Sequence, residues 1–276
     1  MTYRLDPALW RAICTRYPVE LQEKLAACGT PIREKNVHRC RSPACPTCCR
    51  LRGRAEGGRA LAFFSDADHA NMALLTVSPG FIADLADWRG MNTKFISDTR
   101  NLMNKQRRAF PRRWGGVSLY GWPEVDPIGQ ADLPILPTRI HEYVGAARPT
   151  WHGEWIWMPH WHLVVDAAGV DWQEVRDVFA ERWSLPSQVD VRPFNPAMGS
   201  KDQSITRIAR YSNKFGVCKS WDGVRSEWSP SAVAEMRAWM ALDGWTGKRF
   251  LIKPKASRRG LLRFDGNQFD GMAMLV

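Results

Sequence analysis

The most constraining feature of this sequence is the segment EWIWMPHWHLVVD at residues 154–166, in which two histidines stand one residue apart. The apolar content and length of the segment predict a buried strand. Side chains two residues apart in a strand project from the same face, so His160 and His162 share one face and Trp161 points to the other. The two imidazoles are roughly 7 Å apart along the strand and can converge on one ion. A pair of hydrogen-bonded core histidines is the alternative.

The chain around this segment alternates between two periodicities. Asp171 is expected to cap a helix over 171–183. Ser204 is expected to cap a helix over 204–216, and Gly216 is expected to end it. Residues 123–137 contain four prolines and are expected to form a loop. The patterns predict strands over 72–77, 115–122, 139–146, 154–166 and 188–194, and helices over 86–110, 171–183 and 204–216. Hairpins mixed with helices favour an α+β fold, with helices packed on an antiparallel sheet.

A third metal ligand follows from the predicted hairpin. If residues 139–146 and 155–166 pair about a turn near residue 151, Glu142 lies opposite His160 on the same side of the sheet. A His, His, Glu site with open positions suits Mg²⁺ or Mn²⁺ bridging a phosphate. Because a slip of one residue in register would remove Glu142 from the site, Glu124 remains the rival carboxylate.

The helix predicted over 204–216 carries a tyrosine at the border of its packed face. Lys214 follows Tyr211 by three residues, so the ammonium lies beside the phenol. A cation there favours the phenolate and can hold a phosphate. An amphipathic boundary tyrosine would give the same pattern. On the exposed side of this helix, Arg207 and Arg210 are candidate DNA contacts.

A cysteine cluster precedes these elements. Cys28, Cys40, Cys45 and Cys48 have the spacing C-x11-C-x4-C-x2-C, which predicts a structural Zn²⁺ site. Cys49 and His38 are spare candidates, and a set of free buried thiols is the alternative. The arginines around the cluster either contact a DNA backbone or form a solvated face; they are Arg39, Arg41, Arg50, Arg52 and Arg54.

The charge of the chain indicates a polyanionic partner. Its 276 residues carry a formal net charge of +11, concentrated in stretches such as 105–114, where Arg107 and Arg108 are candidate DNA contacts, and 255–263. The 14 tryptophans include rings that could stack on unpaired bases. Without an apolar run of about 18 residues, no membrane span is expected. The N-terminal residues lack the layout of a secretory signal, so we expect a cytoplasmic protein.

Taken together, the motifs resemble those of HUH endonucleases. LLTVS (74–78), PHWHLVV (159–165) and ARYSNKFG (209–216) occur in the order that this family uses, and CRSPACPTC (40–48) is similar to a cluster upstream of them in rolling-circle replication initiators of bacterial plasmids. The resemblance covers roughly residues 28–220. It implies that His160 and His162 bind the divalent metal with an acidic residue, for which we choose Glu142. It also implies that Tyr211 is the single nucleophile, that Lys214 contacts the phosphate, and that the core is a split, RRM-like sheet.

The same resemblance implies a function. Such an enzyme nicks single-stranded or hairpin DNA at a replication origin through a 5′-phosphotyrosine and leaves a 3′-hydroxyl that primes synthesis. The sequence contains no GxxxxGK[ST] motif, so a host helicase would act beside the host polymerase in the bacterial cytoplasm. The alternatives are a zinc-dependent DNA-binding protein without catalysis, and an HUH transposase or relaxase.

The expected organisation has three parts. Residues 1–65 form a helical, cysteine-rich zinc-binding module, and residues 66–220 form the endonuclease domain. Residues 221–276 form an extension with a helix near 229–242 and a strand near 248–253.

Overall fold

A computed structural model describes residues 7–33, 36–151, 153–215, 218–221, 224–242 and 249–254. In this part of the chain the fold is α+β, built on a five-stranded antiparallel sheet with the order β6-β3-β5-β4-β9. The strands are β3 (Met72–Val77), β4 (Ser118–Gly129), β5 (Trp155–Asp166), β6 (Val189–Pro193) and β9 (Phe250–Ile252).

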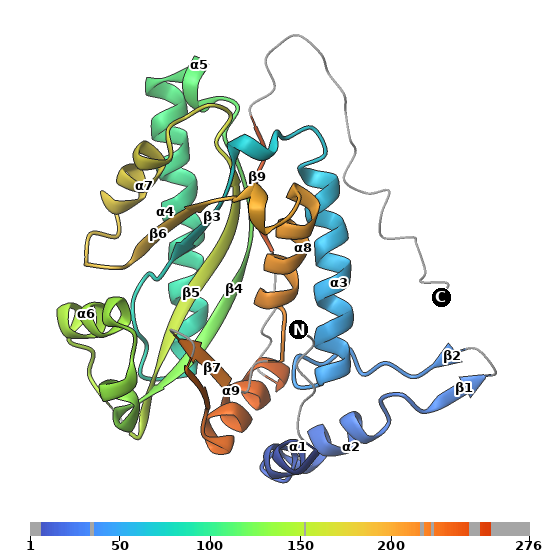
Figure 1. The fold of residues 1–276 in the computed structure, drawn as a ribbon. Coiled ribbons are helices and arrows are strands. Elements are labelled where there is room, and N and C mark those ends of the chain that lie inside the picture. Colours follow the sequence, from blue (N-terminus) through green and yellow to red (C-terminus); the bar gives the residue numbers. More distant parts are fainter. Residues whose placement is uncertain are drawn as a thin grey trace.

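Helices cover both faces of this sheet (Figure 1). Helices α4 (Trp88–Ala109) and α7 (Trp172–Ala180) pack on one face, where Trp161 of β5 contributes to the largest apolar cluster. Helices α3 (Pro46–Phe63) and α8 (Lys201–Ser212) pack on the other face, which carries Val164. The period-two alternation of β5 thus separates the two cores, and the face with even-numbered residues is the one that α8 covers.

The remaining elements surround this centre. Helices α1 and α2 are separate, with Pro18 between them, and they belong to an apolar cluster with α9. The bounds are α1 (Pro7–Cys14), α2 (Val19–Ala26), α5 (Pro111–Trp114), α6 (Thr138–Ala147) and α9 (Pro230–Leu242), with two small hairpins β1 (Pro31–Arg33)–β2 (Asn36–Val37) and β7 (Cys218–Trp221)–β8 (Val224–Glu227). Single 3-10 turns are η1 (His69–Asn71), η2 (Leu85–Asp87), η3 (Gln130–Ile135) and η4 (Pro196–Met198).

Several predicted elements are confirmed. β3 and β6 match their predicted strands, and α4 and α9 match their predicted helices, each to within a few residues. Asp171 caps α7, where its carboxylate accepts a hydrogen bond from the backbone N–H of Gln173. No helix in the described part of the chain has both the length and the apolar character needed to cross a membrane.

The strand predicted over 139–146 is wrong. These residues form helix α6, which buries Ile140, Tyr143 and Val144 on one side. That i, i+3, i+4 spacing is the helical period, and it outweighs the strand preference of the individual Ile, Tyr and Val residues.

The loop predicted over 123–137 is wrong for residues 123–129, because β4 continues through Pro123 and Pro127 to Gly129; the connection is the 3-10 segment η3 and the residues after it. Strand β9 pairs only with Leu119–Gly121 of β4. Beyond Gly121, β4 is therefore an edge strand among the described residues. Proline is tolerated at an edge, since no neighbouring strand requires its missing N–H.

The predicted start of α8 is four residues late. Ser200, not Ser204, caps the helix, and the Gln203 side chain returns a hydrogen bond to the Ser200 backbone N–H. This is the reciprocal capping box that the sequence S-x-x-Q signals. Gly216 and the basic stretch 255–263 lie outside the described residues.

Candidate metal centre and active site

The register of β4 and β5 determines which carboxylate meets the histidines. Glu124 lies directly opposite His160, and Trp122 lies opposite His162. The Glu124 carboxylate therefore projects toward the same face as both imidazoles. Its Oε2 lies 3.1 Å from His162 Nε2 and 3.4 Å from His160 Nε2. The three ligand atoms all fall within 4.8 Å of one another, so this group could hold a metal ion.

The outer nitrogens of both imidazoles are already engaged. His160 Nδ1 lies 3.2 Å from the Met158 carbonyl oxygen, which can only accept, so Nδ1 carries the proton. His162 Nδ1 lies 3.2 Å from Thr76 Oγ1 on β3. These contacts direct the two Nε2 atoms to Glu124, as outer partners do for histidines that bind metals. The spacing of 3.1–3.4 Å is close to the separation of about 3 Å between adjacent ligands of a small octahedral cation.

Burial and charge act in opposite directions on the two histidines. Burial lowers the pKa of His162 below its usual value, although the Glu124 hydrogen bond opposes this. For His160, burial also lowers the pKa, but Asp126 and Glu124 outweigh it and leave the pKa raised. The pKa of Glu124 is well below its usual value despite burial, because Lys214 and the histidines stabilise its charge. Glu124 is thus an ionised acceptor.

Asp126 is a second buried acid that sequence reasoning missed. Its Oδ2 lies 4.0 Å from His160 Nε2, and its Oδ1 has no hydrogen-bond partner among the described residues. Burial raises its pKa to about 6. Residues 124 and 126 share a face in a strand, so the pair was visible in the sequence, but only once this segment is a strand and not a loop.

Tyr211 and Lys214 lie beside the cluster formed by Glu124, His160 and His162. The Tyr211 ring centroid is 5.4 Å from that of His162, and half of the Tyr211 side chain is exposed. Lys214 Nζ lies 3.2 Å from the centre of the tyrosine ring and 3.5 Å from Glu124 Oε1. The ammonium therefore stands between the phenol and the carboxylate.

The phenol of Tyr211 is not the phenolate that its lysine neighbour alone would favour. Glu124 is the largest influence and raises the pKa of Tyr211 to about 12, with burial acting in the same direction and Lys214 opposing. Burial disfavours the charge of Lys214, but Glu124, Tyr211 and Asp126 together outweigh it and raise the lysine pKa. In the structure the site thus holds a neutral phenol beside an ammonium.

Close packing of α8 on α3 sets the position of Tyr211. A Cβ placed on Gly53 would lie 3.2 Å from the Arg210 Cα, which is tighter than most Cβ contacts, so glycine favours this close approach of the two helices. At the other end of α8, Lys201 Nζ donates to three backbone carbonyls at the end of α3, those of Phe64, Ser65 and Ala67.

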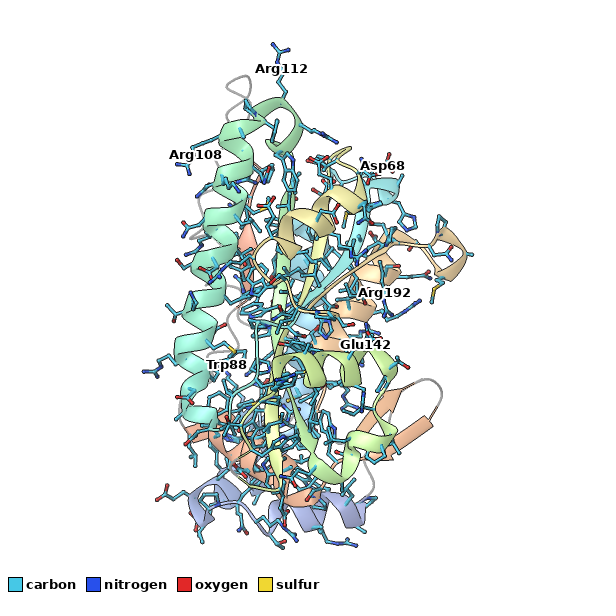
Figure 2. All side chains as sticks on the ribbon, turned by 90° about the vertical axis from the view of Figure 1, so that its left-hand side faces the viewer. Asp68, Trp88, Arg108, Arg112, Glu142 and Arg192 are labelled. Atoms are coloured by element: carbon cyan, nitrogen blue, oxygen red, sulfur yellow. The ribbon has the colours of Figure 1, made fainter. Side chains whose placement is uncertain are left out.

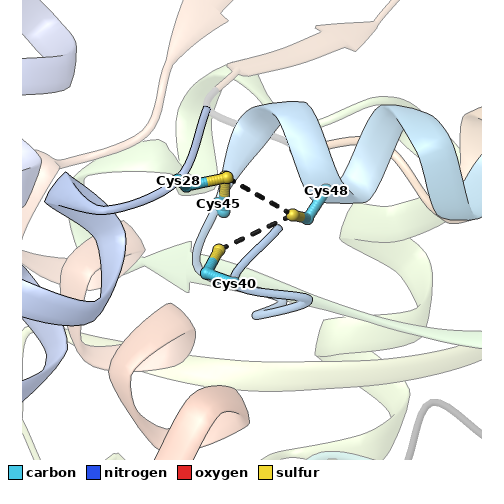
Figure 3. A group of neighbouring side chains, drawn as sticks. All are labelled: Cys28, Cys40, Cys45 and Cys48. Carbon is cyan, nitrogen blue, oxygen red and sulfur yellow. Dashed lines mark hydrogen bonds between the residues drawn. The ribbon is translucent and has the colours of Figure 1, made fainter. Parts of the chain in front are cut away.

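The four predicted cysteines form one cluster (Figure 3). The Sγ atom of Cys48 lies 3.7 Å from that of Cys28 and 3.6 Å from that of Cys40, and Cys45 lies 3.7 Å from Cys28. A tetrahedral zinc with bonds of about 2.3 Å requires sulfur atoms about 3.8 Å apart. The cluster could therefore hold a metal such as zinc.

The spare candidate Cys49 does not belong to this cluster. Its Sγ donates to the Pro43 carbonyl, and burial raises its pKa. Burial also raises the pKa of Cys40, to about 11, so a cation that binds the cluster would displace thiol protons.

Two predicted site residues lie elsewhere. Glu142 is exposed on α6 and does not join the histidines (Figure 2). Arg107 is buried, and its Nη2 donates to the carbonyls of Val117 and Lys253 at 2.6 and 2.8 Å. It therefore anchors the end of the sheet and is not available to DNA.

The other predicted DNA contacts are exposed. Arg108 points outward from α4, on the face of the sheet opposite the histidines (Figure 2). Arg207 and Arg210 lie on the exposed side of α8, and Arg207 also donates to the Met198 carbonyl. Only the two arginines of α8 are on the same helix as Tyr211.

Comparisons of this chain with protein families, with curated proteins and with solved structures found no match. The residues and their geometry therefore carry the functional argument.

Proposed function

We propose that this chain is a metal-dependent endonuclease and strand transferase that nicks single-stranded DNA through Tyr211, as its resemblance to HUH replication initiators implies. The observation that carries the proposal is the convergence of three separate elements. β4 supplies Glu124, β5 supplies the two histidines, and the end of α8 supplies Tyr211, whose ring centroid is 5.4 Å from that of His162.

The arrangement of the strands supports a split, RRM-like core. The segment runs β3-α4-β4-β5-α7-β6, and its strands have the spatial order β6-β3-β5-β4. Both helices of this unit pack on one face of the sheet. The opposite face is then left for the histidines and for α8. A β-α-β-β-α-β unit of this kind is a recurrent supersecondary arrangement.

The cluster of His160, His162 and Glu124 fits Mg²⁺ or Mn²⁺. Glu124 is ionised, and the histidines present Nε2 atoms whose outer nitrogens are engaged. When bound, such an ion would withdraw charge from a phosphate oxygen and offset the charge of Glu124. His160, His162 and Glu124 would hold it, with Asp126 beside them.

Tyr211 is the proposed nucleophile. Its Oη attacks phosphorus as the phenol loses its proton, and the bond from phosphorus to the 3′ oxygen breaks. The 3′ oxygen takes up a proton, and the 5′-phosphate stays on the tyrosine. Lys214 keeps its charge beside the ring, so it stabilises the developing phenolate and the phosphate. Because the ester is retained, the reverse transfer can rejoin the ends without ATP.

The substrate is a phosphate that a stacked duplex would not present, so the partner is single-stranded or hairpin DNA at an origin. The free 3′-hydroxyl would prime a host polymerase, with a host helicase opening the duplex. Zinc in the cysteine cluster would have a structural role and hold the start of α3.

A covalent adduct tests this proposal. The protein is incubated with Mn²⁺ and a pool of single-stranded and hairpin oligonucleotides of random sequence, labelled in separate reactions at either end. A 5′-phosphotyrosine leaves the 3′-labelled fragment on the protein in a denaturing gel and releases the 5′-labelled fragment. We expect Tyr211→Phe to abolish the adduct, whereas Tyr143→Phe on α6 retains it.

Two results would contradict the proposal. An adduct that persists in Tyr211→Phe rejects this nucleophile, and DNA binding without any adduct favours a zinc-dependent binding protein. The cysteine cluster is the observation that favours this second function. Joining of two different DNA ends without a replicative role would instead indicate a transposase or relaxase.

A further inference from the structure

A hollow of about 470 Å³ lies directly beside the candidate active site. This volume includes solvent-open space, and only a small part of it admits a water-sized sphere. Its walls come from the loop between Cys40 and Cys45, which carries Pro43, and from α3, β4, the end of α8 and α9. Glu124 and Lys214 belong both to this hollow and to the candidate active site. The hollow is therefore continuous with the place where the scissile phosphate would lie.

The charged residues of this hollow favour an anion. Three cations line it, Arg52, Lys214 and Arg237, against a single acid, Glu124. That acid is already shared with the histidines, and its Oε1 is occupied by Lys214. In the described part of the chain, neither Arg52 nor Arg237 forms an ion pair with a carboxylate.

Arg237 of α9 is held in place by carbonyl groups and a ring instead of an ion pair. Its side chain lies over the Phe215 ring and is only 8% exposed. Its Nη2 donates to the Lys214 carbonyl at 3.2 Å, and its Nη1 lies 3.5 Å from the Pro43 carbonyl. Its Nε is buried and has no partner among the described residues. The charge of buried Asp126 acts on Arg237 without forming an ion pair with it among the described residues. A buried guanidinium with a free donor and no carboxylate in contact is a group that an anionic ligand would complete.

Arg52, near the start of α3, lines the same hollow. Its Nη2 donates to the Arg41 carbonyl at 3.3 Å, and the side chain is partly exposed. Burial raises the pKa of the Cys49 thiol, whereas the charges of Arg237 and Arg52 lower it. Both guanidinium groups thus lie near Cys49 in the wall of the hollow.

We propose that this hollow binds a second phosphate of the DNA strand, adjacent to the phosphate that Tyr211 attacks. This inference rests on the proposed function. Guanidinium groups match phosphate oxygens in geometry as well as charge, and the small space that admits a water-sized sphere suits a phosphate better than a base. The DNA strand then runs from Tyr211 past Lys214 toward the cysteine cluster. The segment around this cluster would contribute to DNA binding as well as to stability.

Arg52 allows a clean test, because its neighbour Arg54 projects from the opposite side of α3 and is exposed. Binding of a fluorescent short oligothymidylate is measured by anisotropy over a range of NaCl concentrations. The protein carries Tyr211→Phe, and no Mg²⁺ or Mn²⁺ is added, so cleavage cannot contribute. Arg52→Gln should weaken binding about 10-fold and reduce the salt dependence by about 0.7 in slope, the value of one phosphate contact on a single strand. Arg54→Gln should change affinity by less than about two-fold.

The outcomes separate this proposal from the proposed function. Equal effects of Arg52→Gln and Arg54→Gln overturn the second phosphate site, even if the Tyr211 adduct forms. A selective loss with Arg52→Gln supports the site, even if no adduct is found. Matching zinc content and thermal unfolding midpoints of the two variants ensure that the difference comes from the binding surface.

Discussion

Asp126 is a carboxylate that the fold buries without giving both of its oxygens a partner. Its pKa rises from 3.8 to about 6, chiefly because of burial. A raised carboxyl pKa means that the fold disfavours the charged form. The cost is absent below pH 3.8, grows as the pH rises and is complete above about 6. A residue that destabilises the protein in this way is best explained by a role in the site.

Asp126→Asn should therefore stabilise the chain when no Mg²⁺ or Mn²⁺ is added. Above pH 6 we expect a gain on the order of 1–3 kcal/mol in the free energy of unfolding, which disappears as the pH falls toward 3.8. Urea unfolding across this pH range measures it. The same variant should bind Mn²⁺ more weakly. A stability gain that does not depend on pH would contradict this explanation.

Thr76 orients a candidate ligand without touching the position of the ion. Its Oγ1 is 3.2 Å from His162 Nδ1, so Thr76→Val keeps the shape of the side chain and removes the hydrogen bond. We expect Mn²⁺ affinity to fall by about 10–100-fold, as for other outer partners of metal-binding histidines. Electron paramagnetic resonance of free Mn²⁺ gives the affinity. Thr93→Val, which removes an exposed hydroxyl on α4, should leave it unchanged.

Among single residues, sequence periodicity predicted the shared face of the histidines and the proximity of Lys214 to Tyr211. It could not select between Glu142 and Glu124, because the choice depends on strand register, which local sequence does not encode. The prolines at positions 123 and 127 favoured a loop prediction for the end of the strand that carries Glu124.

At the scale of elements, the α3–α8 contact decides where the phenol lies. Gly53→Leu should push α8 away from α3, because the Cβ alone already meets the Arg210 backbone. We expect a loss of about 1–3 kcal/mol in the free energy of unfolding and reduced adduct formation. Gly58→Leu on the same helix is the matched control, since nothing lies within 4 Å of a Cβ there.

Gly58→Leu should stabilise α3 by up to about 1 kcal/mol through helix propensity. Thermal unfolding and adduct yield of both variants check this prediction. Similar losses at the two positions would mean that the close approach of the helices does not control the site.

Most helices and strands were predictable because their apolar periodicity is strong, as in β3, β5 and α4. Helix α6 was not, because Ile140, Tyr143 and Val144 suit a strand by type and a helix by spacing. The start of α8 was misplaced because Ser200 and Ser204 are both possible caps and only Ser200 has glutamine at the third following position.

At the scale of the whole molecule, α3 connects the cysteine cluster to the sheet. It begins directly after Cys45, and its Glu56 carboxylate accepts hydrogen bonds from Tyr120 Oη and Trp122 Nε1 of β4. Loss of the cluster should therefore reach the active site through this helix. No local pattern in the sequence predicted that connection, because it joins segments about 65 residues apart.

Cys48→Ser tests this connection. The purified chain should contain zinc in an equimolar amount, and this variant should lose it, unfold at a lower temperature and form less adduct. Cys14→Ser, outside the cluster, should retain zinc and activity. Elemental analysis gives the zinc content, calorimetry the unfolding temperature and a denaturing gel the adduct yield. Full zinc content in Cys48→Ser would contradict the assignment of the cluster.

The two oxygens of Glu124 face different neighbours, Oε2 the imidazoles and Oε1 the ammonium of Lys214. An ion that takes the first oxygen need not break the contact made by the second. Binding of an ion and retention of the lysine contact are then compatible, so Tyr211, the proposed nucleophile, can keep Lys214 beside it when an ion is bound. In the proposed reaction, such a centre would not have to release its lysine before the ion binds.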